Sequence, residues 1–350
     1  HNLALAYALN NSTDSALSVI KRTITYNANY PFEKEHAFQA LKKSNHYSEL
    51  IQLSDSLNSN FSSSEVEVIA TKNTLHAEDI AVINNRVFIS DVHRGQLIQI
   101  ESDGEISVLA NLSSSLMALV VDHQNNLWIT TSMIPQYNEY DSTRESQTFI
   151  YQYDIKGGNI KEKIPLEGQH VLGAGCIDQS GNVYFTDSQK PIIYKLNTSN
   201  NIIEVFMPLD DAFNLQGITY HESDNSLYVA DYIKGIAKIS LEDNTIHWLI
   251  PEEFLLKGID GLSSVQNGLI AIQNGSAQKR LLFVMIDDEG VAQVDIVDNN
   301  LNYAGEPTNG KVIEGKYYYI ANSPWPLYEK DGKANPNNWE ALEIRSWKVR

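Results

Sequence analysis

The segment GAGCIDQSGNVYFTD, residues 173–187, contains two short apolar strands joined by a Ser-Gly-Asn turn. Apolar strands on both sides of a Ser-Gly or Asn-Gly turn are a strong signal for a β-hairpin. The same arrangement, ending on a small or polar residue, occurs six times along the chain. The six copies begin at Glu78, Met117, Gly173, Gln216, Asp260 and Asn309.

The spacing of these copies predicts the architecture. They begin 39, 56, 43, 44 and 49 residues apart, and the four-stranded blades of β-propellers recur at about 40–50 residues. Further apolar strand pairs lie between copies, for example 96–100 with 106–109, and the longest interval holds an insertion at 133–147. We therefore predict an all-β fold, a six-bladed β-propeller, over residues 65–350.

The ring of blades also has to close. A strand at 66–70 precedes the first copy and has no blade of its own. Pairing with the last blade, near 342–347, would cover two sheet edges that would otherwise be open. The sequence does not show which of the two strands is outermost.

Residues 1–60 have a different pattern. Their apolar residues cluster at helical spacing, Ser12 and Thr13 are suited to begin a helix that runs through Thr23, and Pro31 with acids after it resembles a second helix start. A polar run at 58–64 separates this part from the strands. We predict a small α-helical N-terminal extension.

The first residues of the six copies should form a ring at one mouth of the central channel, because each innermost strand begins there. This ring contains the carboxylates of Glu78 and Asp260 and the amides of Gln216 and Asn309. Calcium prefers about six to eight oxygen ligands of this kind. The second strands end around the ring, and the repeated Asp91, Asp187 and Asp231 should accept backbone N–H bonds in the turns that follow.

The blades resemble those of the senescence-marker-protein/gluconolactonase-like propeller family, whose wider relatives include paraoxonases. The resemblance covers residues 66–350 and depends on the paired inner strands quoted above. It implies a divalent cation in the channel, Ca²⁺ or another, held by Glu78, Gln216 and Asp260. The family has Asn where this chain has Gln216, and Gly173 replaces a further Asn. The implied activity is metal-dependent hydrolysis of a sugar lactone or related ester, with Asp260 helping to activate water.

Other residues near this mouth are candidates for catalysis or substrate binding. His93 could act as a general base if its pKa is near neutrality, although it also fits an ordinary turn. The predicted substrate-binding residues are His76, Met117, His170, Asn309 and Trp325. Trp325 lies in the Ser-Pro-Trp-Pro segment 323–326 and should overhang the mouth as a stiff aromatic lid.

Charge and composition limit the partners. The formal net charge is −18 and the pI is about 4.8, so a nucleic-acid partner is not expected. No apolar run approaches the roughly 18 residues of a membrane span. The single cysteine, Cys176, is expected to be a small buried side chain. Because the chain starts at His1, we expect a removed leader and a periplasmic or secreted location.

Two alternatives remain open. The propeller could be non-catalytic and bind a small ligand or a protein partner, with the N-terminal helices as a docking arm. It could also be a strictosidine-synthase-like propeller, which needs no metal. That third hypothesis leaves Glu78 and Asp260 without a purpose at the ring.

Overall fold

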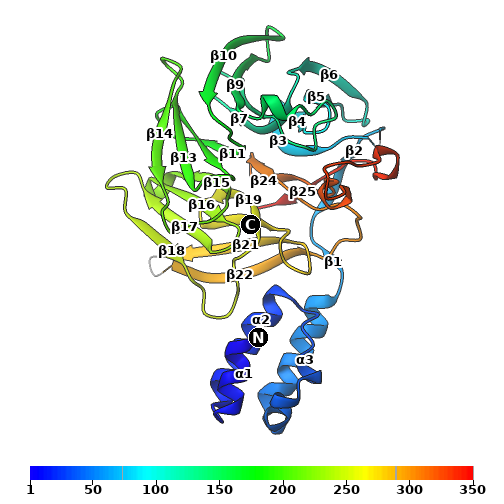
Figure 1. The fold of residues 1–350 in the computed structure, drawn as a ribbon, viewed down its shortest axis with the longest axis vertical. Coiled ribbons are helices and arrows are strands. Elements are labelled where there is room, and N and C mark those ends of the chain that lie inside the picture. The colour runs from blue at the N-terminus through cyan, green and yellow to red at the C-terminus, as the bar shows by residue number, and fades with distance from the viewer. Residues whose placement is uncertain (73, 288–289, 350) are drawn as a thin grey trace.

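The computed structural model describes residues 1–72, 74–287 and 290–349, and its main body is a ring of six antiparallel sheets (Figure 1). Each sheet is one blade. The first strands of successive blades contact one another around the ring, so they enclose the central channel. The six-bladed propeller predicted from the repeat is confirmed.

The blades follow one another in sequence order. Blade 1 consists of β3 (Ala77–Ile83), β4 (Arg86–Asp91), β5 (Gln96–Ile100) and β6 (Ile106–Asn111). Blade 2 consists of β7 (Ser115–Val121), β8 (Asn126–Ser132), β9 (Gln147–Asp154) and β10 (Asn159–Glu167). Blade 3 consists of β11 (Leu172–Ile177), β12 (Asn182–Asp187), β13 (Ile192–Asn197) and β14 (Ile202–Pro208). Blade 4 consists of β15 (Leu215–His221), β16 (Ser226–Asp231), β17 (Gly235–Ser240) and β18 (Ile246–Leu249). Blade 5 consists of β19 (Ile259–Val265), β20 (Gly268–Gln273), β21 (Arg280–Asp287) and β22 (Gly290–Asn299). Blade 6 contains β23 (Gly310–Ile313), β24 (Lys316–Ile320) and β25 (Glu343–Lys348).

The ring closes through a strand from the N-terminal side. β2 (Glu65–Ile69) pairs antiparallel with β25 and becomes the outermost strand of blade 6. A two-residue strand before it, β1 (Phe61–Ser62), pairs with β22 at the edge of blade 5. The predicted closure is confirmed, and the strand order shows that the N-terminal strand is the outer one. Two edges are thereby covered.

Local chemistry explains the hairpins of the repeat. Asn84 and Asn85 between β3 and β4 have φ angles of 52° and 61°. Two consecutive left-handed residues make a type I′ turn, whose twist matches that of the strands, and Asn tolerates this conformation better than other side chains. The apolar residues of neighbouring blades then pack face to face, with Ile80, Ile89 and Ile98 fully buried.

The repeated aspartates at the ends of the second strands have a structural role. Asp91 Oδ1 accepts a hydrogen bond from the backbone N–H of Arg94 at 3.0 Å. Asp231 Oδ1 accepts from the backbone N–H of Ile233 at 3.0 Å, and its Oδ2 accepts from that of Asn214 at 2.8 Å. The prediction that these carboxylates hold the following turns is confirmed.

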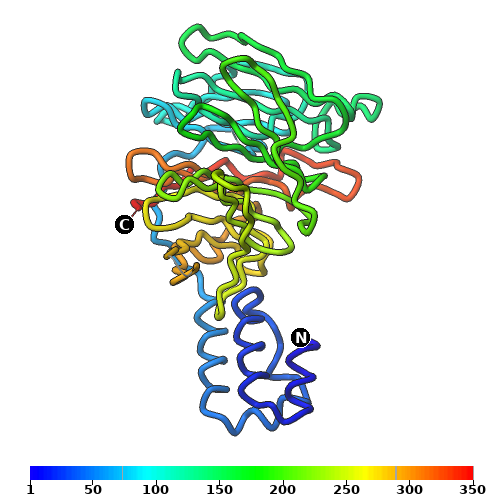
Figure 2. Tube along the Cα trace, turned by 90° about the vertical axis from the view of Figure 1, so that its left-hand side faces the viewer, coloured from blue at the N-terminus to red at the C-terminus, as the bar shows by residue number. Residues whose placement is uncertain are grey.

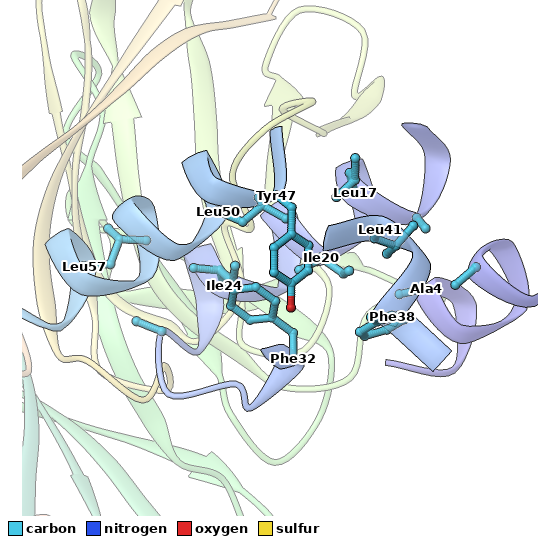
Figure 3. Close-up of a cluster of buried hydrophobic side chains, with 13 residues drawn as sticks. Ala4, Leu17, Ile20, Ile24, Phe32, Phe38, Leu41, Tyr47, Leu50 and Leu57 are labelled. Atoms are coloured by element: carbon cyan, nitrogen blue, oxygen red, sulfur yellow. The ribbon is translucent and has the colours of Figure 1, made fainter. Parts of the chain in front are cut away.

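The N-terminal residues form a helical unit that projects from the propeller beside blade 5 (Figures 1 and 2). It consists of α1 (Asn2–Leu9), α2 (Thr13–Tyr26), α3 (Asn45–Asn58) and the 3₁₀ helices η1 (Phe32–Lys34) and η2 (His36–Lys43). Figure 3 shows the apolar side chains that hold it together, among them Ile20, Phe32 and Leu50. Within the described ranges, no helix is both long and apolar enough to cross a bilayer. The predicted helical extension is confirmed, although η1 and η2 take the tighter 3₁₀ form.

Four further 3₁₀ turns in the described part of the chain belong to the propeller loops. They are η3 (Ser142–Arg144), η4 (Glu222–Asp224) and η5 (Trp325–Leu327), followed by η6 (Pro336–Asn338) in the same long segment as η5. η3 lies in the insertion predicted from the longest interval between copies. η5 follows β24 and brings Trp325 over the channel mouth.

Candidate functional site

One mouth of the channel holds a cavity of about 270 Å³. Its lining residues come from all six blades or their loops: Glu78, Met117, Ile134, Gln136, Val171, Gly173, Ser188, Gln216, Tyr232, Asp260, Asn274, Glu306 and Trp325. Five of the six first positions of the repeat are among them. The structure thus brings together the predicted metal ligands and the predicted substrate-binding residues Met117 and Trp325.

Irregular pairing turns the first positions toward this cavity. The register between the first two strands shifts in blades 1 to 5, at Ala77/Ile80, Leu116/Leu119, Leu172/Ala174, Leu215/Ile218 and Ile259/Leu262. Such bulges re-aim side chains and are common beside active sites. In blade 6, whose residues 310–320 are all described, β23 and β24 pair without a shift, and Asn309 does not line the cavity.

Glycine residues after two of these positions bring the inner strands close together. A Cβ on Gly217 would lie 2.5 Å from the carbonyl oxygen of Asp260, and a Cβ on Gly261 would lie 2.4 Å from that of Thr308. No side chain fits at either place. Gln216 and Asp260 are therefore held next to each other by the close approach of blades 4, 5 and 6.

Glu78 is buried, with 6% of its surface exposed. Its Oε2 accepts a hydrogen bond of 2.6 Å from the indole N–H of Trp325. Burial raises the pKa of Glu78 well above its usual range, and the negative charge of Asp260 raises it further. The indole bond favours the ionised form but does not offset these two effects.

Asp260 is held by an amide. Its Oδ2 accepts a hydrogen bond of 2.6 Å from Nδ2 of Asn274, which also donates to the carbonyl oxygen of Pro307 at 3.0 Å. The hydroxyl of Tyr232 donates to Oδ1 of Asn274 at 2.9 Å. Burial, and then the charge of Glu306, raises the pKa of Asp260 to about 7. The carboxyl group therefore exchanges its proton near neutral pH.

Gln216 presents an amide oxygen to the same space. Its Nε2 donates to Oδ1 of Asn214 at 2.6 Å, which fixes the orientation of the amide. A Cβ on Gly173 would lie 3.9 Å from Oε1 of Gln216 and would meet no closer atom. The glycine thus leaves open space beside that oxygen.

The donor set is suited to a hard cation. In the described part of the chain, Oε1 of Glu78, Oδ1 of Asp260 and Oε1 of Gln216 have no hydrogen-bond partner. Oxygen atoms of two carboxylates and one amide are ligands that calcium accepts. Among residues 1–72, 74–287 and 290–349, no group of three or more His, Cys, Asp or Glu is placed to hold a metal ion. A cation here would therefore need Gln216.

The predicted histidines lie outside the cavity lining. Nδ1 of His76 is 2.8 Å from the hydroxyl of Tyr328, and the His76 ring lies edge-on to Trp325 with centroids 4.4 Å apart. Nδ1 of His93 is 3.0 Å from the carbonyl oxygen of Gln136. Burial lowers the pKa of both histidines. The His76 ring thus packs against Trp325, whereas the His93 ring packs against Tyr328 and Trp339.

Three other residues that the sequence singled out, His170, Asn309 and Cys176, do not line this cavity either. His170 is 4% exposed, and its two ring nitrogens lie 2.7 Å from Oδ2 of Asp187 and 2.8 Å from the carbonyl oxygen of Glu167. Nδ2 of Asn309 donates to the carbonyl oxygen of Glu78 at 3.4 Å. Cys176 lines a separate cavity among the six inner strands farther along the channel and is half-buried, and burial raises the pKa of its thiol.

Sequence reasoning missed several residues of the cavity. Ser188, Tyr232 and Asn274 each follow the last residue of a second strand, in blades 3, 4 and 5. The repeat contained this signal, because aligning the copies one residue further places all three in the same column. Glu306 lies outside the repeat, in the segment before β23, where it pairs with Lys279 at 2.9 Å.

Comparisons with known proteins agree with the architecture. No protein-family model and no curated protein sequence matches the chain. A PQQ-bound aldose sugar dehydrogenase from Streptomyces coelicolor superposes with a TM-score of 0.56 at 9% identity, over 81% of this chain and 97% of that one. A gluconolactonase from Xanthomonas campestris gives 0.52 at 14% identity, over 83% and 92%. A virginiamycin B lyase from Staphylococcus aureus gives 0.52 at 14% identity, over 82% and 88%. The chain therefore has the fold of the gluconolactonase-like six-bladed β-propellers.

Proposed function

We propose that the protein is a metal-dependent hydrolase of sugar lactones or related esters, acting in the cavity at the channel mouth. One observation carries the proposal. Glu78 is buried and Asp260 is partly buried in a single cavity, where each is held by one N–H donor. Among the described residues, each keeps one oxygen without a hydrogen-bond partner. Burying two carboxylates side by side is costly unless a cation or a proton offsets the charge. Such an arrangement is more typical of a functional site than of a structural one.

Calcium or another divalent cation would be held by Glu78, Asp260 and Gln216. The chemistry that it supplies is polarisation of the substrate carbonyl and stabilisation of the developing oxyanion. The chain contributes the rest. Asn274 fixes the carboxylate of Asp260, which would help to activate an attacking water molecule by accepting its proton.

The walls of the cavity favour a small, partly polar substrate. Met117, Ile134 and Trp325 supply apolar surface, while Ser188 and Gln136 add polar groups that could bind hydroxyls. A volume of about 270 Å³ is near the lower limit of ordinary small-molecule sites. These features fit a monosaccharide-sized lactone better than a polymer.

Calcium binding and lactone hydrolysis test the proposal together. Purified protein, treated with EDTA and dialysed, is titrated with calcium in a calorimeter and assayed with gluconolactone and aryl esters. We expect calcium to bind and to restore turnover, and the double variant Glu78→Gln, Asp260→Asn to lose both. Glu162→Gln, which removes an exposed carboxylate from β10, is the matched control and should keep both. Failure of the wild type to bind calcium or turn over any of these substrates would contradict the proposal.

Protein binding through the helical unit is a second candidate function. A cavity of about 390 Å³ runs between α2 and α3, and another of about 560 Å³ continues where the helices meet β22. The rim of the first carries the acids Asp14 and Glu49 together with Lys21 and His46, and Lys21 is paired with Glu253 outside this cavity. Its apolar floor is formed by Leu17, Leu50 and Leu53. An apolar floor with an acidic rim would suit an amphipathic helix that carries basic residues.

A synthetic amphipathic peptide with leucines on one face and lysines on the other tests this second function. Binding that Leu53→Asp abolishes, and that a glutamate version of the peptide does not show, would support it. Equal binding of the lysine and glutamate peptides, or none, would contradict it.

A further inference from the structure

The loop between β20 and β21, residues 274–279, joins the candidate site to the helical unit. At its start, Nδ2 of Asn274 donates to Asp260 at 2.6 Å. The residue after it, Gly275, has its carbonyl oxygen bonded to a residue of α2. The side chain that holds Asp260 and the backbone atom that the helices contact are therefore neighbours in the chain.

Tyr26, the last residue of α2, binds this loop at two points. Its hydroxyl donates to the carbonyl oxygen of Gly275 at 2.6 Å, and its own carbonyl oxygen accepts from the backbone N–H of Ala277 at 3.2 Å. The two bonds lie on either side of Ser276. The middle of the loop is thereby tied to the end of a helix.

Neighbouring contacts make the helical unit a fixed support. The backbone N–H of Ala28 donates to Oε1 of Gln278 at 3.0 Å, and Nε2 of Gln278 donates to Oδ1 of Asn58 at the end of α3 at 2.8 Å. The guanidinium of Arg280, only 1% exposed, donates to the carbonyl oxygen of Thr25. The C-terminal ends of α2 and α3 are thus both anchored on blade 5. The apolar core of the helical unit keeps the helices together (Figure 3).

The loop packs tightly against residues that line the cavity, so the position of the loop affects the cavity. A Cβ on Gly275 would lie 2.7 Å from Cα of Gly258 and 2.7 Å from the hydroxyl oxygen of Tyr232. The backbone N–H of Gly275 also donates to the carbonyl oxygen of Gly258 at 3.1 Å. Because there is no spare space, a shift of Gly275 must move Tyr232 or Asn274, which are bonded to each other and line the cavity.

We propose that the helical unit forms part of the frame of the candidate site and that Tyr26 is a positioning residue. Through Gly275, Tyr26 fixes the position of Asn274, and Asn274 in turn fixes the carboxylate of Asp260. The inference rests on the proposed function for its effect on metal binding. It gives the N-terminal helices a role in the propeller's own site, in addition to any partner that they bind. It also explains why both polar groups of Tyr26 are directed to one loop.

Tyr26→Phe tests the inference, because it removes one hydroxyl and keeps the ring. The matched control is Tyr47→Phe in the same helical unit, since the Tyr47 hydroxyl is buried and has no hydrogen-bond partner among the described residues. In metal-free protein we expect the amide of Gly275 and that of Ala277 to exchange hydrogen about 3- to 10-fold faster in Tyr26→Phe. The side-chain amide resonance of Asn274 should shift, and Tyr47→Phe should change neither.

Calcium titration supplies the functional readout. Changes in residues that support metal ligands typically weaken metal binding about 10- to 100-fold, and we expect roughly this loss for Asn274→Ala and about 3-fold for Tyr26→Phe. An unshifted Asn274 resonance, or calcium affinity unchanged in Tyr26→Phe, would overturn the inference while leaving the proposed function intact. If the wild type binds no calcium, the proposed function fails, and the metal-free exchange and resonance measurements still decide whether Tyr26 positions Asn274.

Discussion

Replacing Asp260 by Asn should stabilise the metal-free protein at pH 8, although it changes a partly buried side chain that accepts a hydrogen bond from Asn274. The ionised carboxylate is destabilised by burial and by the charge of Glu306, which raises its pKa to about 7, compared with about 3.9 in an unfolded chain. At about 1.4 kcal/mol for each pH unit, the upper limit of this penalty is about 4 kcal/mol. The cavity is open to water, which reduces the penalty, so we expect a gain of about 1–2 kcal/mol.

The pH dependence has a definite sign. Between about pH 4 and pH 7 the folded protein holds a proton on Asp260 that the unfolded chain has already released. The stability of the wild type should therefore fall as pH rises through this window and then level off. The Asn variant lacks this dependence. Urea unfolding in EDTA should show little difference between the two proteins at pH 4.5 and the full difference at pH 8.

Another aspartate, Asp231, gives the control. Asp231 is fully buried, and its two oxygens accept backbone N–H bonds, including those of Phe213 at 2.6 Å and Ile233 at 3.0 Å. Asp231→Asn turns an NH₂ group toward N–H donors and should destabilise by about 1–3 kcal/mol. If Asp260→Asn destabilises the protein at pH 8 as Asp231→Asn does, Asp260 is a structural acceptor and our reasoning about the site is refuted.

Three further predictions concern the lid, the open side of the cavity and the support of the helical unit. Trp325→Phe removes the N–H that holds Glu78 and should weaken calcium binding by about 1.5–3 kcal/mol in a calorimetric titration; an unchanged affinity would show that the bond is dispensable. Gly173→Asn places an amide in open space and should strengthen calcium binding about tenfold with no loss of melting temperature; weaker binding would contradict the assignment of the cavity. Arg280→Met removes the guanidinium that donates to the carbonyl oxygen of Thr25 and should cost about 2–3 kcal/mol in urea unfolding, whereas a stability equal to the wild type would mean that the guanidinium does not support the helices.

Most of the candidate site could be located from the sequence because a propeller repeats its geometry. Once the copies are aligned, residues at equivalent positions must lie at the same mouth, and Glu78, Gln216 and Asp260 do line one cavity. The same alignment failed for Asn309. The first positions of blades 1 to 5 project inward at register shifts that hydrophobic patterns do not reveal, and blade 6 pairs regularly.

The directions of the histidine side chains could not be predicted from the sequence. In the sequence, residues of the channel mouth lie close to His76, His93 and His170. The direction of a side chain, however, depends on what packs around it. Burial among aromatic rings turns His76 toward Tyr328, and His170 is held by Asp187. Neither contact is visible from spacing along the chain.

The sequence by itself determined the six-fold repeat, and with it the propeller, the strand that closes the ring and the helical character of the first residues. These features depend on local periodicity and turn chemistry, which each segment carries on its own. Only the tertiary structure decided that Asn274 and Trp325 hold the two carboxylates and that Tyr26 contacts the loop beside them. These contacts join residues as much as 249 positions apart, and their formation depends on the close packing of blades around the channel.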